Sequence, residues 1–183
     1  QVIEQAKKQG INEKRLNALQ MQLKPTASEN MQLKPKDLEI NKLLMFCKNR
    51  QFDEAEKLAL SLSEKYPKHP FSWKVLGALR KQTGRIIESL IPIQKSVQLA
   101  PQDLEAHFNL ANTLKALGRL EEAVASYKQV ITLKPELAEA HSNLGNTLKA
   151  LGKLEEAETS YKQAITLKPE LAEAHFNLAN TLK

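Results

Sequence analysis

Three histidines recur at equal intervals in the second half of the chain, and imidazole is a common metal ligand and proton carrier. His107, His141 and His175 are each separated by 34 residues. If each belongs to its own helical repeat, neighbouring rings lie about 10 Å apart, which is one helix-packing distance. A zinc–imidazole bond is only about 2 Å long, so two such rings cannot share one ion. We therefore expect the histidines to fill packing positions, and we predict no metal site.

The other candidates for chemistry lack the partners that catalysis needs. Cys47 is the only cysteine, so it forms no intrachain disulfide, and no activating base is evident beside it. The pairs Glu121–Glu122 and Glu155–Glu156 fall where helices are expected to start, and there their negative charges interact favourably with the helix dipole. The sequence holds no Gly-rich phosphate loop, CxxC, HExxH or nucleophile-elbow pattern. We predict a protein that is not an enzyme and that uses no cofactor.

Asparagine forms the repeated pattern that best fits a binding function. Its two registers, three residues apart, are Asn109, Asn143 and Asn177, and Asn112, Asn146 and Asn180. Residues at i and i+3 share a helix face, and this face is not the apolar one. An amide both donates and accepts, so it can pair with the C=O and N–H of a peptide, which advances about 10 Å in three extended residues. The alternative is that these amides cap turns or bond adjacent helices.

The segments that carry these residues repeat with a period of 34 residues. One residue type marks the same point of every period: Pro67, Pro101, Pro135 and Pro169. Residues 101–134 and 135–168 differ at only nine of 34 positions. Self-similarity at this period is typical of a solenoid built from pairs of helices.

Each repeat predicts two helices separated by a glycine. Leu110 and Leu114 belong to the apolar stripe of the first helix, and Tyr127 and Val130 belong to that of the second. Gly118 lies between the stripes, where a left-handed residue would end the first helix. The same scheme fits 135–168 and, more loosely, 67–100.

Composition agrees with an all-α protein. Apolar residues make up 42% of the chain and charged residues 26%, and β-branched residues never cluster as strands require. No apolar run approaches the roughly 20 residues of a membrane span, so we expect no membrane partner. Residues 1–100 carry a net charge of +8 and residues 101–183 a net charge of −2. Because the basic residues form no dense block, we read them as solvated helix faces and expect no nucleic acid partner.

These features together resemble the tetratricopeptide repeat (TPR) family. The residues that carry the resemblance in one repeat are His141, Leu144, Gly145, Gly152, Leu154, Ala157, Tyr161, Ala164 and Pro169. The resemblance implies an all-α, right-handed superhelical solenoid of antiparallel helix pairs. The array is also similar to those of bacterial TPR proteins and of O-linked N-acetylglucosamine transferases, and the register of Asn109 matches the asparagine ladder of the latter.

The resemblance also implies where a partner would bind. In TPR solenoids the first helix of each pair lines a concave groove, and both asparagine registers are among those that point into it. By the same alignment we expect other groove residues to be Phe108, Phe176, Lys115 and Lys149, with the variable position of Phe108, Ser142 and Phe176 setting specificity. The carboxylate clamp of chaperone-binding TPR domains is not expected, because Ala78 stands where the asparagine partner of Lys74 would be.

We divide the chain into an N-terminal part and an array. Residues 1–35 form a helical extension, with a helix expected from Asn12 to Lys24, and a linker; they are either a decayed repeat or an extension that docks on the array. The array, 36–183, comprises 36–66 as a degenerate unit with Arg50 in place of the glycine, then 67–100, 101–134, 135–168 and the half repeat 169–183. The half repeat would expose apolar surface, so either more repeats follow or the C-terminal helix supports a homo-oligomer.

The sequence thus predicts a cytoplasmic scaffold whose groove binds extended segments of a protein or peptide through an asparagine ladder. An alternative is a substrate-recruiting N-terminal arm of a glycosyltransferase or sulfotransferase whose catalytic domain is absent from this chain. That alternative depends on residues 66–85, which resemble a stretch near the start of bacterial TPR arrays that precede such domains. RNA binding, as in pentatricopeptide repeats, is disfavoured by the 34-residue period and by the −2 charge of the regular repeats.

Overall fold

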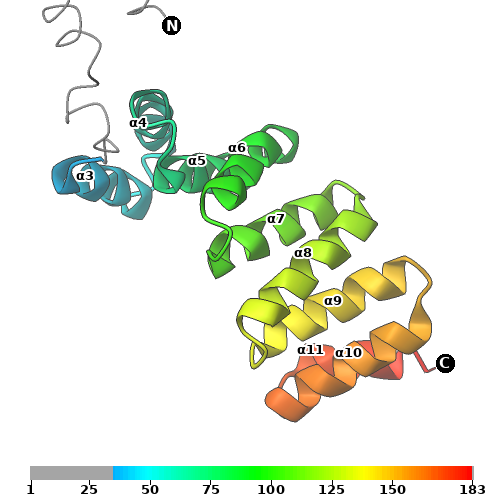
Figure 1. Cartoon of the computed structure of the whole chain (residues 1–183). Helices are drawn as coiled ribbons and strands as arrows, with labels where there is room; N and C mark the ends of the chain where they lie inside the picture. The colour runs from blue at the N-terminus through cyan, green and yellow to red at the C-terminus, as the bar shows by residue number, and fades with distance from the viewer. Residues whose placement is uncertain (1–34, 183) are drawn as a thin grey trace, which may run out of the picture. The chain divides into compact units, whose positions relative to one another are not determined.

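A computed structural model describes residues 35–182, which belong to one compact unit. In this range the chain forms only helices, with no strand. Figure 1 labels them: α3 Asp37–Lys48, α4 Phe52–Lys65, α5 Pro70–Gln82, α6 Ile86–Leu99, α7 Leu104–Ala116, α8 Leu120–Leu133, α9 Ala138–Ala150, α10 Leu154–Leu167 and α11 Ala172–Ala179. The predicted all-α solenoid is therefore confirmed. The helix expected over 12–24 lies outside the described residues.

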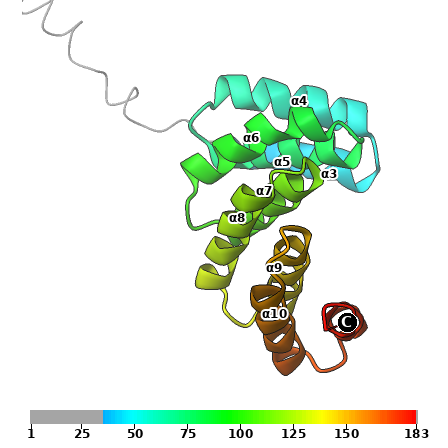
Figure 2. The same ribbon diagram turned by 90° about the vertical axis from the view of Figure 1, so that its right-hand side faces the viewer.

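Successive helices pack as antiparallel pairs that stack in chain order. The pairs α5–α6, α7–α8 and α9–α10 make the most extensive contacts, and each pair also touches the next one (Figure 1). Two pairs of first helices contact one another as well, since α5 meets α7 and α9 meets α11. Figure 2, turned by 90°, shows α9–α10 following α7–α8 along the stack. The first helices thus form one layer, and that layer carries the asparagine registers.

Left-handed residues end the first helix of each complete pair, as the glycine spacing predicts. Gly84, Gly118 and Gly152 have φ angles of 80°, 73° and 75°. Arg50 adopts the same conformation with φ of 56°, although a side chain disfavours it. The N–H of the next residue, Gln51, donates to the carbonyl of Phe46 at 3.0 Å, which closes the turn. The degenerate unit therefore forms the same helix–turn–helix with a strained residue at its turn.

Small residues allow the two helices of a pair to approach closely. Ala123 and Ala157 are fully buried, and so are the large rings of Tyr127 and Tyr161 beside them. The approach is tight at Gly77, where an added Cβ would lie 2.4 Å from the Ile93 side chain, and at Gly145, where it would lie 2.6 Å from the Tyr161 ring. Tyr127 and Tyr161 therefore belong to the core, as the stripe of the second helix indicates.

The repeated histidines join successive pairs through hydrogen bonds to the backbone. Nε2 of His141 lies 2.8 Å from the carbonyl oxygen of Pro135, and His107 and His175 make the same contact with the prolines six residues before them. Trp73 donates its indole N–H to the carbonyl of Pro67 at 3.0 Å in the earlier repeat. A carbonyl only accepts, so each Nε2 carries the proton. The ring thus fixes the start of the first helix to the proline that follows the previous pair.

Candidate functional site

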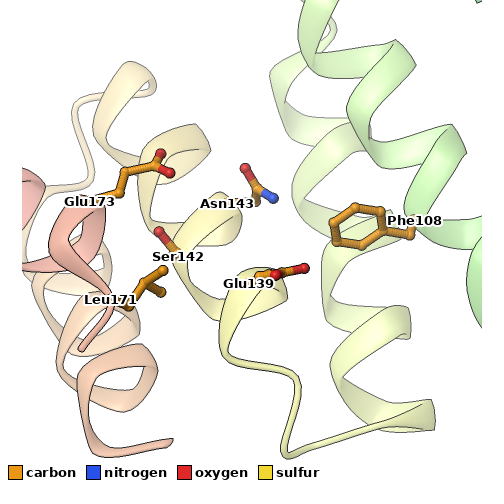
Figure 3. Close-up of a pocket in the computed structure, with 6 residues that line it drawn as sticks. All are labelled: Phe108, Glu139, Ser142, Asn143, Leu171 and Glu173. Carbon is orange, nitrogen blue, oxygen red and sulfur yellow. The ribbon is translucent and has the colours of Figure 1, made fainter. Parts of the chain in front are cut away.

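A pocket of about 330 Å³ opens on the layer of first helices. Figure 3 shows the residues that line it: Phe108 of α7, Glu139, Ser142 and Asn143 of α9, Leu171 just before α11, and Glu173 of α11. These residues come from three consecutive repeats. The pocket therefore lies on the face where the sequence predicts a groove.

The pocket exists because one register alternates between large and small side chains. Phe108, Ser142 and Phe176 occupy equivalent positions, and the small serine between the two phenylalanines leaves space above α9. Phe108 is held in place by Tyr127 of α8, whose ring meets it edge-on with 6.1 Å between centroids. Phe176 is 68% exposed and does not line the pocket.

Polar atoms in the pocket are only partly satisfied by the described part of the chain. Glu173 Oε1 accepts a hydrogen bond from Asn146 Nδ2 at 3.1 Å. Glu139 makes no hydrogen bond or ion pair with any residue in the range 35–182. Ser142 is 4% exposed, and within the same range its hydroxyl has no hydrogen-bond partner. A buried hydroxyl without a partner is costly, so the site has unused hydrogen-bonding capacity.

The first asparagine register keeps part of its hydrogen-bonding capacity free. Asn143 Oδ1 accepts from Lys115 Nζ at 3.2 Å, and Asn177 Nδ2 donates to Asn146 Oδ1 at 2.8 Å. Asn109 makes no side-chain hydrogen bond within residues 35–182. All three side chains are half-buried. Each therefore retains at least one amide group that no described residue engages.

The second asparagine register has an internal role. Tyr127 donates its hydroxyl to Asn112 Oδ1 at 2.5 Å, and Tyr161 donates to Asn146 Oδ1 at 2.7 Å. Burial, with the nearby charge of Glu173, raises the pKa of Tyr161 to about 12, so this hydroxyl stays a donor. These amides therefore bond the second helix of their own pair, which is the alternative that the sequence leaves open.

A signal for this pairing is present in the sequence. In both regular repeats the tyrosine follows the asparagine by 15 residues. In the earlier repeat Ile93 replaces the tyrosine, and Ala78 replaces the asparagine. The two positions thus change together in this repeat, as expected where no buried phenol requires an acceptor. Asn180, in the last repeat, lies at the C-cap of α11.

The predicted lysines differ in their surroundings. Lys115 bonds to Asn143, as described above, whereas Lys149 is half-buried and forms no ion pair with a residue of the described range. A third lysine, Lys74 on α5, lies one repeat before Phe108 and forms ion pairs with Glu105 at 2.8 Å and Asp103 at 3.0 Å. Although burial opposes its charge, these bonds raise the pKa of Lys74. On the first-helix layer, a lysine therefore already forms an ion pair with Glu105, which is equivalent to Glu139 and Glu173 in the next two repeats.

The described part of the chain shows neither a metal site nor a membrane-spanning helix. Among residues 35–182 no group of His, Cys, Asp or Glu side chains is arranged to hold a metal ion. None of the helices in that range combines the length and the apolar composition of a membrane span.

Family comparisons agree with the repeat architecture. A model described as "TPR repeat" matches residues 111–152 and 145–183, and a model described as "Tetratricopeptide repeat" matches residues 93–125. The chain is a tetratricopeptide repeat protein. No curated protein matches the sequence.

Solved structures show that the TPR array has relatives in shape at low sequence identity. MamA 41-end from Desulfovibrio magneticus RS-1 superposes with a TM-score of 0.74 at 19% identity, covering 79% of this chain and 81% of that one. YrrB, described as a TPR protein with an unusual peptide-binding site, gives 0.71 at 22% identity over 75% and 71%. The first TPR of Spaghetti (RPAP3), bound to the HSP90 peptide SRMEEVD, gives 0.59 at 24% identity over 62% and 90%. At these identities the likeness establishes the fold.

Proposed function

We propose that the TPR array is a protein-interaction scaffold that binds an extended segment of a partner protein along α7, α9 and α11. The observation that carries this proposal is the pocket, which is shared by these three first helices and includes polar groups, those of Glu139 and Ser142, that residues 35–182 leave unused. The structures of YrrB and of the RPAP3 domain support it, because YrrB is described as having an unusual peptide-binding site and the RPAP3 domain is bound to a peptide.

The first asparagine register supplies the main-chain contacts in this proposal. Asn109, Asn143 and Asn177 stand one repeat apart, and three residues of extended peptide span about the same 10 Å. In Figure 3 the amide nitrogen of Asn143 is directed toward the side of Phe108, where a peptide carbonyl could accept from it. Asn112 and Asn146 act indirectly, because their oxygens are engaged by tyrosine hydroxyls.

The expected affinity of such a ladder alone is low. Each neutral hydrogen bond contributes about 0.5–1.5 kcal/mol net, so three rungs correspond to micromolar or weaker binding. The pocket must therefore add affinity and selectivity through a side chain of the bound segment.

Photo-crosslinking tests the proposed location. A photoreactive phenylalanine at Phe176, which is 68% exposed on the first-helix layer, is incubated with an array of unstructured decapeptides of varied sequence. The matched control places the same group at Ile91 of α6, which is 73% exposed on a second helix. We expect peptides to crosslink at position 176 and not at 91. Equal crosslinking at both positions, or none at 176, would contradict the proposal.

A further inference from the structure

We infer that the pocket between α7, α9 and α11 receives a basic side chain, arginine or lysine, of the bound segment. The inference rests on the proposed function and adds to it the chemical class of the residue that is recognised.

One repeat earlier, the chain supplies such a cation itself. The ammonium of Lys74 lies 2.8 Å from Glu105 Oε2, and Glu105 occupies the position that Glu139 and Glu173 occupy in the next two repeats. A glutamate at this position is therefore oriented so that it can accept a cation approaching from the preceding first helix. The side-chain exposure of Lys74 is 22% and that of Glu105 is 68%, so the ammonium is partly withdrawn from water while the carboxylate stays solvated.

The next repeat has the acceptor but lacks the cation. Phe108 stands where Lys74 stands one repeat before, and Glu139 consequently forms no ion pair with the residues at 35–182. Within residues 35–182, Lys115 is the one cation that bonds to a residue of the pocket lining, and it donates to the amide oxygen of Asn143 and to neither glutamate. Among the described residues, the carboxylate of Glu139 thus has no counterpart to the lysine that pairs with Glu105.

A second exchange in the same register, one repeat later, creates the space that a long side chain needs. Ser142 replaces the phenylalanine of the neighbouring repeats, and its buried hydroxyl has no partner in the described range. In Figure 3 this hydroxyl points toward the gap between Leu171 and Glu173. An arginine or lysine fits this lining because its stem can pack on apolar groups while its charged end reaches acceptors. The ring of Phe108 adds an aromatic face, with which a cation interacts favourably.

A pair of isosteric peptides tests the inference. The probes are two nonapeptides of glycine, serine and alanine that differ only at the centre, which is arginine in one and the neutral isostere citrulline in the other. Each is titrated into ¹⁵N-labelled protein, and dissociation constants are taken from the amide shifts of Ser142, Asn143 and Glu173. We expect the arginine peptide to bind about tenfold more tightly, because charge-assisted hydrogen bonds are stronger than neutral ones.

Two variants and a matched control locate the preference. Glu139→Gln removes the unpaired carboxylate, and Ser142→Phe fills the pocket with the residue that its neighbours carry. Glu155→Gln makes the same charge change at an exposed position on α10. We expect the arginine preference to fall to near unity in the first two variants and to persist in the control. A preference that survives Glu139→Gln as fully as Glu155→Gln would overturn the inference, because it would reflect diffuse charge attraction.

The titration also separates the inference from the function on which it rests. Equal binding of both peptides, with shifts along α7, α9 and α11, would overturn the basic-residue pocket and leave peptide binding in place. The absence of shifts with either peptide would overturn both.

Discussion

Tyr161 donates its hydroxyl to the side-chain oxygen of Asn146, and this bond of 2.7 Å joins the second helix of the pair to the first. Tyr127 makes the equivalent bond to Asn112, so the arrangement belongs to the repeat. It divides the asparagines by role: Asn112 and Asn146 satisfy buried phenols, whereas Asn143 of the other register lines the pocket with its amide nitrogen unengaged by the described residues.

The tyrosine–asparagine bond can be measured by a double-mutant cycle. We expect Asn112→Ala to lower the free energy of unfolding by about 1–3 kcal/mol, because it leaves a buried hydroxyl without an acceptor. Tyr127→Phe removes the hydroxyl, and the double variant should lose less than the sum of the two single losses. Urea unfolding of the four proteins gives the coupling, and strict additivity would show that the bond contributes nothing.

The turn between α3 and α4 contains a correctable strain. Arg50 has a φ of 56°, in the region that glycine adopts at the other turns. We expect Arg50→Gly to raise the free energy of unfolding by roughly 0.5–1 kcal/mol, since relief of the side-chain penalty exceeds the entropic cost of glycine. The reciprocal change, Gly118→Ala, should be destabilising by a similar amount or more. Thermal unfolding of both variants decides this, and a loss of stability on Arg50→Gly would refute the strain.

The crossing of α9 and α10 depends on a small residue. Ala157 is fully buried beside Tyr161. We expect Ala157→Leu to overpack this crossing and to cost roughly 1–3 kcal/mol of stability. An unchanged urea midpoint would mean that the crossing tolerates a larger side chain than the packing indicates.

Protonation of one carboxylate, that of Glu39, should lower the stability of the α3–α4 pair at acid pH. Glu39 accepts hydrogen bonds from Lys65 at 2.8 Å, the backbone N–H of Lys36 at 2.9 Å and Tyr66 at 2.8 Å. The bond from Lys65 contributes most, and together they lower the pKa of Glu39 from 4.5 to about 2. Because the folded pKa lies below the unfolded one, this stabilisation is present above pH 4.5 and is lost as pH falls toward 2.

Thermal melts across this pH range test the carboxylate. Glu39→Gln should flatten the decrease in melting temperature between pH 4.5 and 2, whereas Glu54→Gln, at an exposed position of α4, should leave it unchanged. Identical pH profiles for both variants and the parent protein would show that Glu39 is not responsible.

Much of the fold could be predicted from sequence, because its determinants are local. The proline period, the apolar stripes and Gly118 each act within one helix pair, and near-identical repeats make them visible. The degenerate turn at Arg50 also follows from its alignment with the glycines.

The site was less predictable, because it depends on contacts between helices. The engagement of Asn112 by Tyr127 requires knowing which faces of two helices meet, although the paired replacement by Ala78 and Ile93 carries the signal. The pocket arises from the small volume of Ser142 between neighbouring repeats, which periodicity alone does not reveal. Two other expectations stay predictions: that the chain is the substrate-recruiting arm of a glycosyltransferase or sulfotransferase, and that its C-terminal helix supports a homo-oligomer.

The central claim is that the first asparagine register holds the main chain of a bound segment. Its most direct test is fluorescence anisotropy with a labelled decapeptide of a sequence that crosslinks at position 176. The test compares the parent protein with a triple variant in which Asn109, Asn143 and Asn177 are replaced by alanine. The control is Asn41→Ala, at an exposed position of α3. We predict that the triple variant binds at least about tenfold more weakly, while its melting temperature stays close to that of the parent. Unchanged affinity in a folded triple variant would contradict the account.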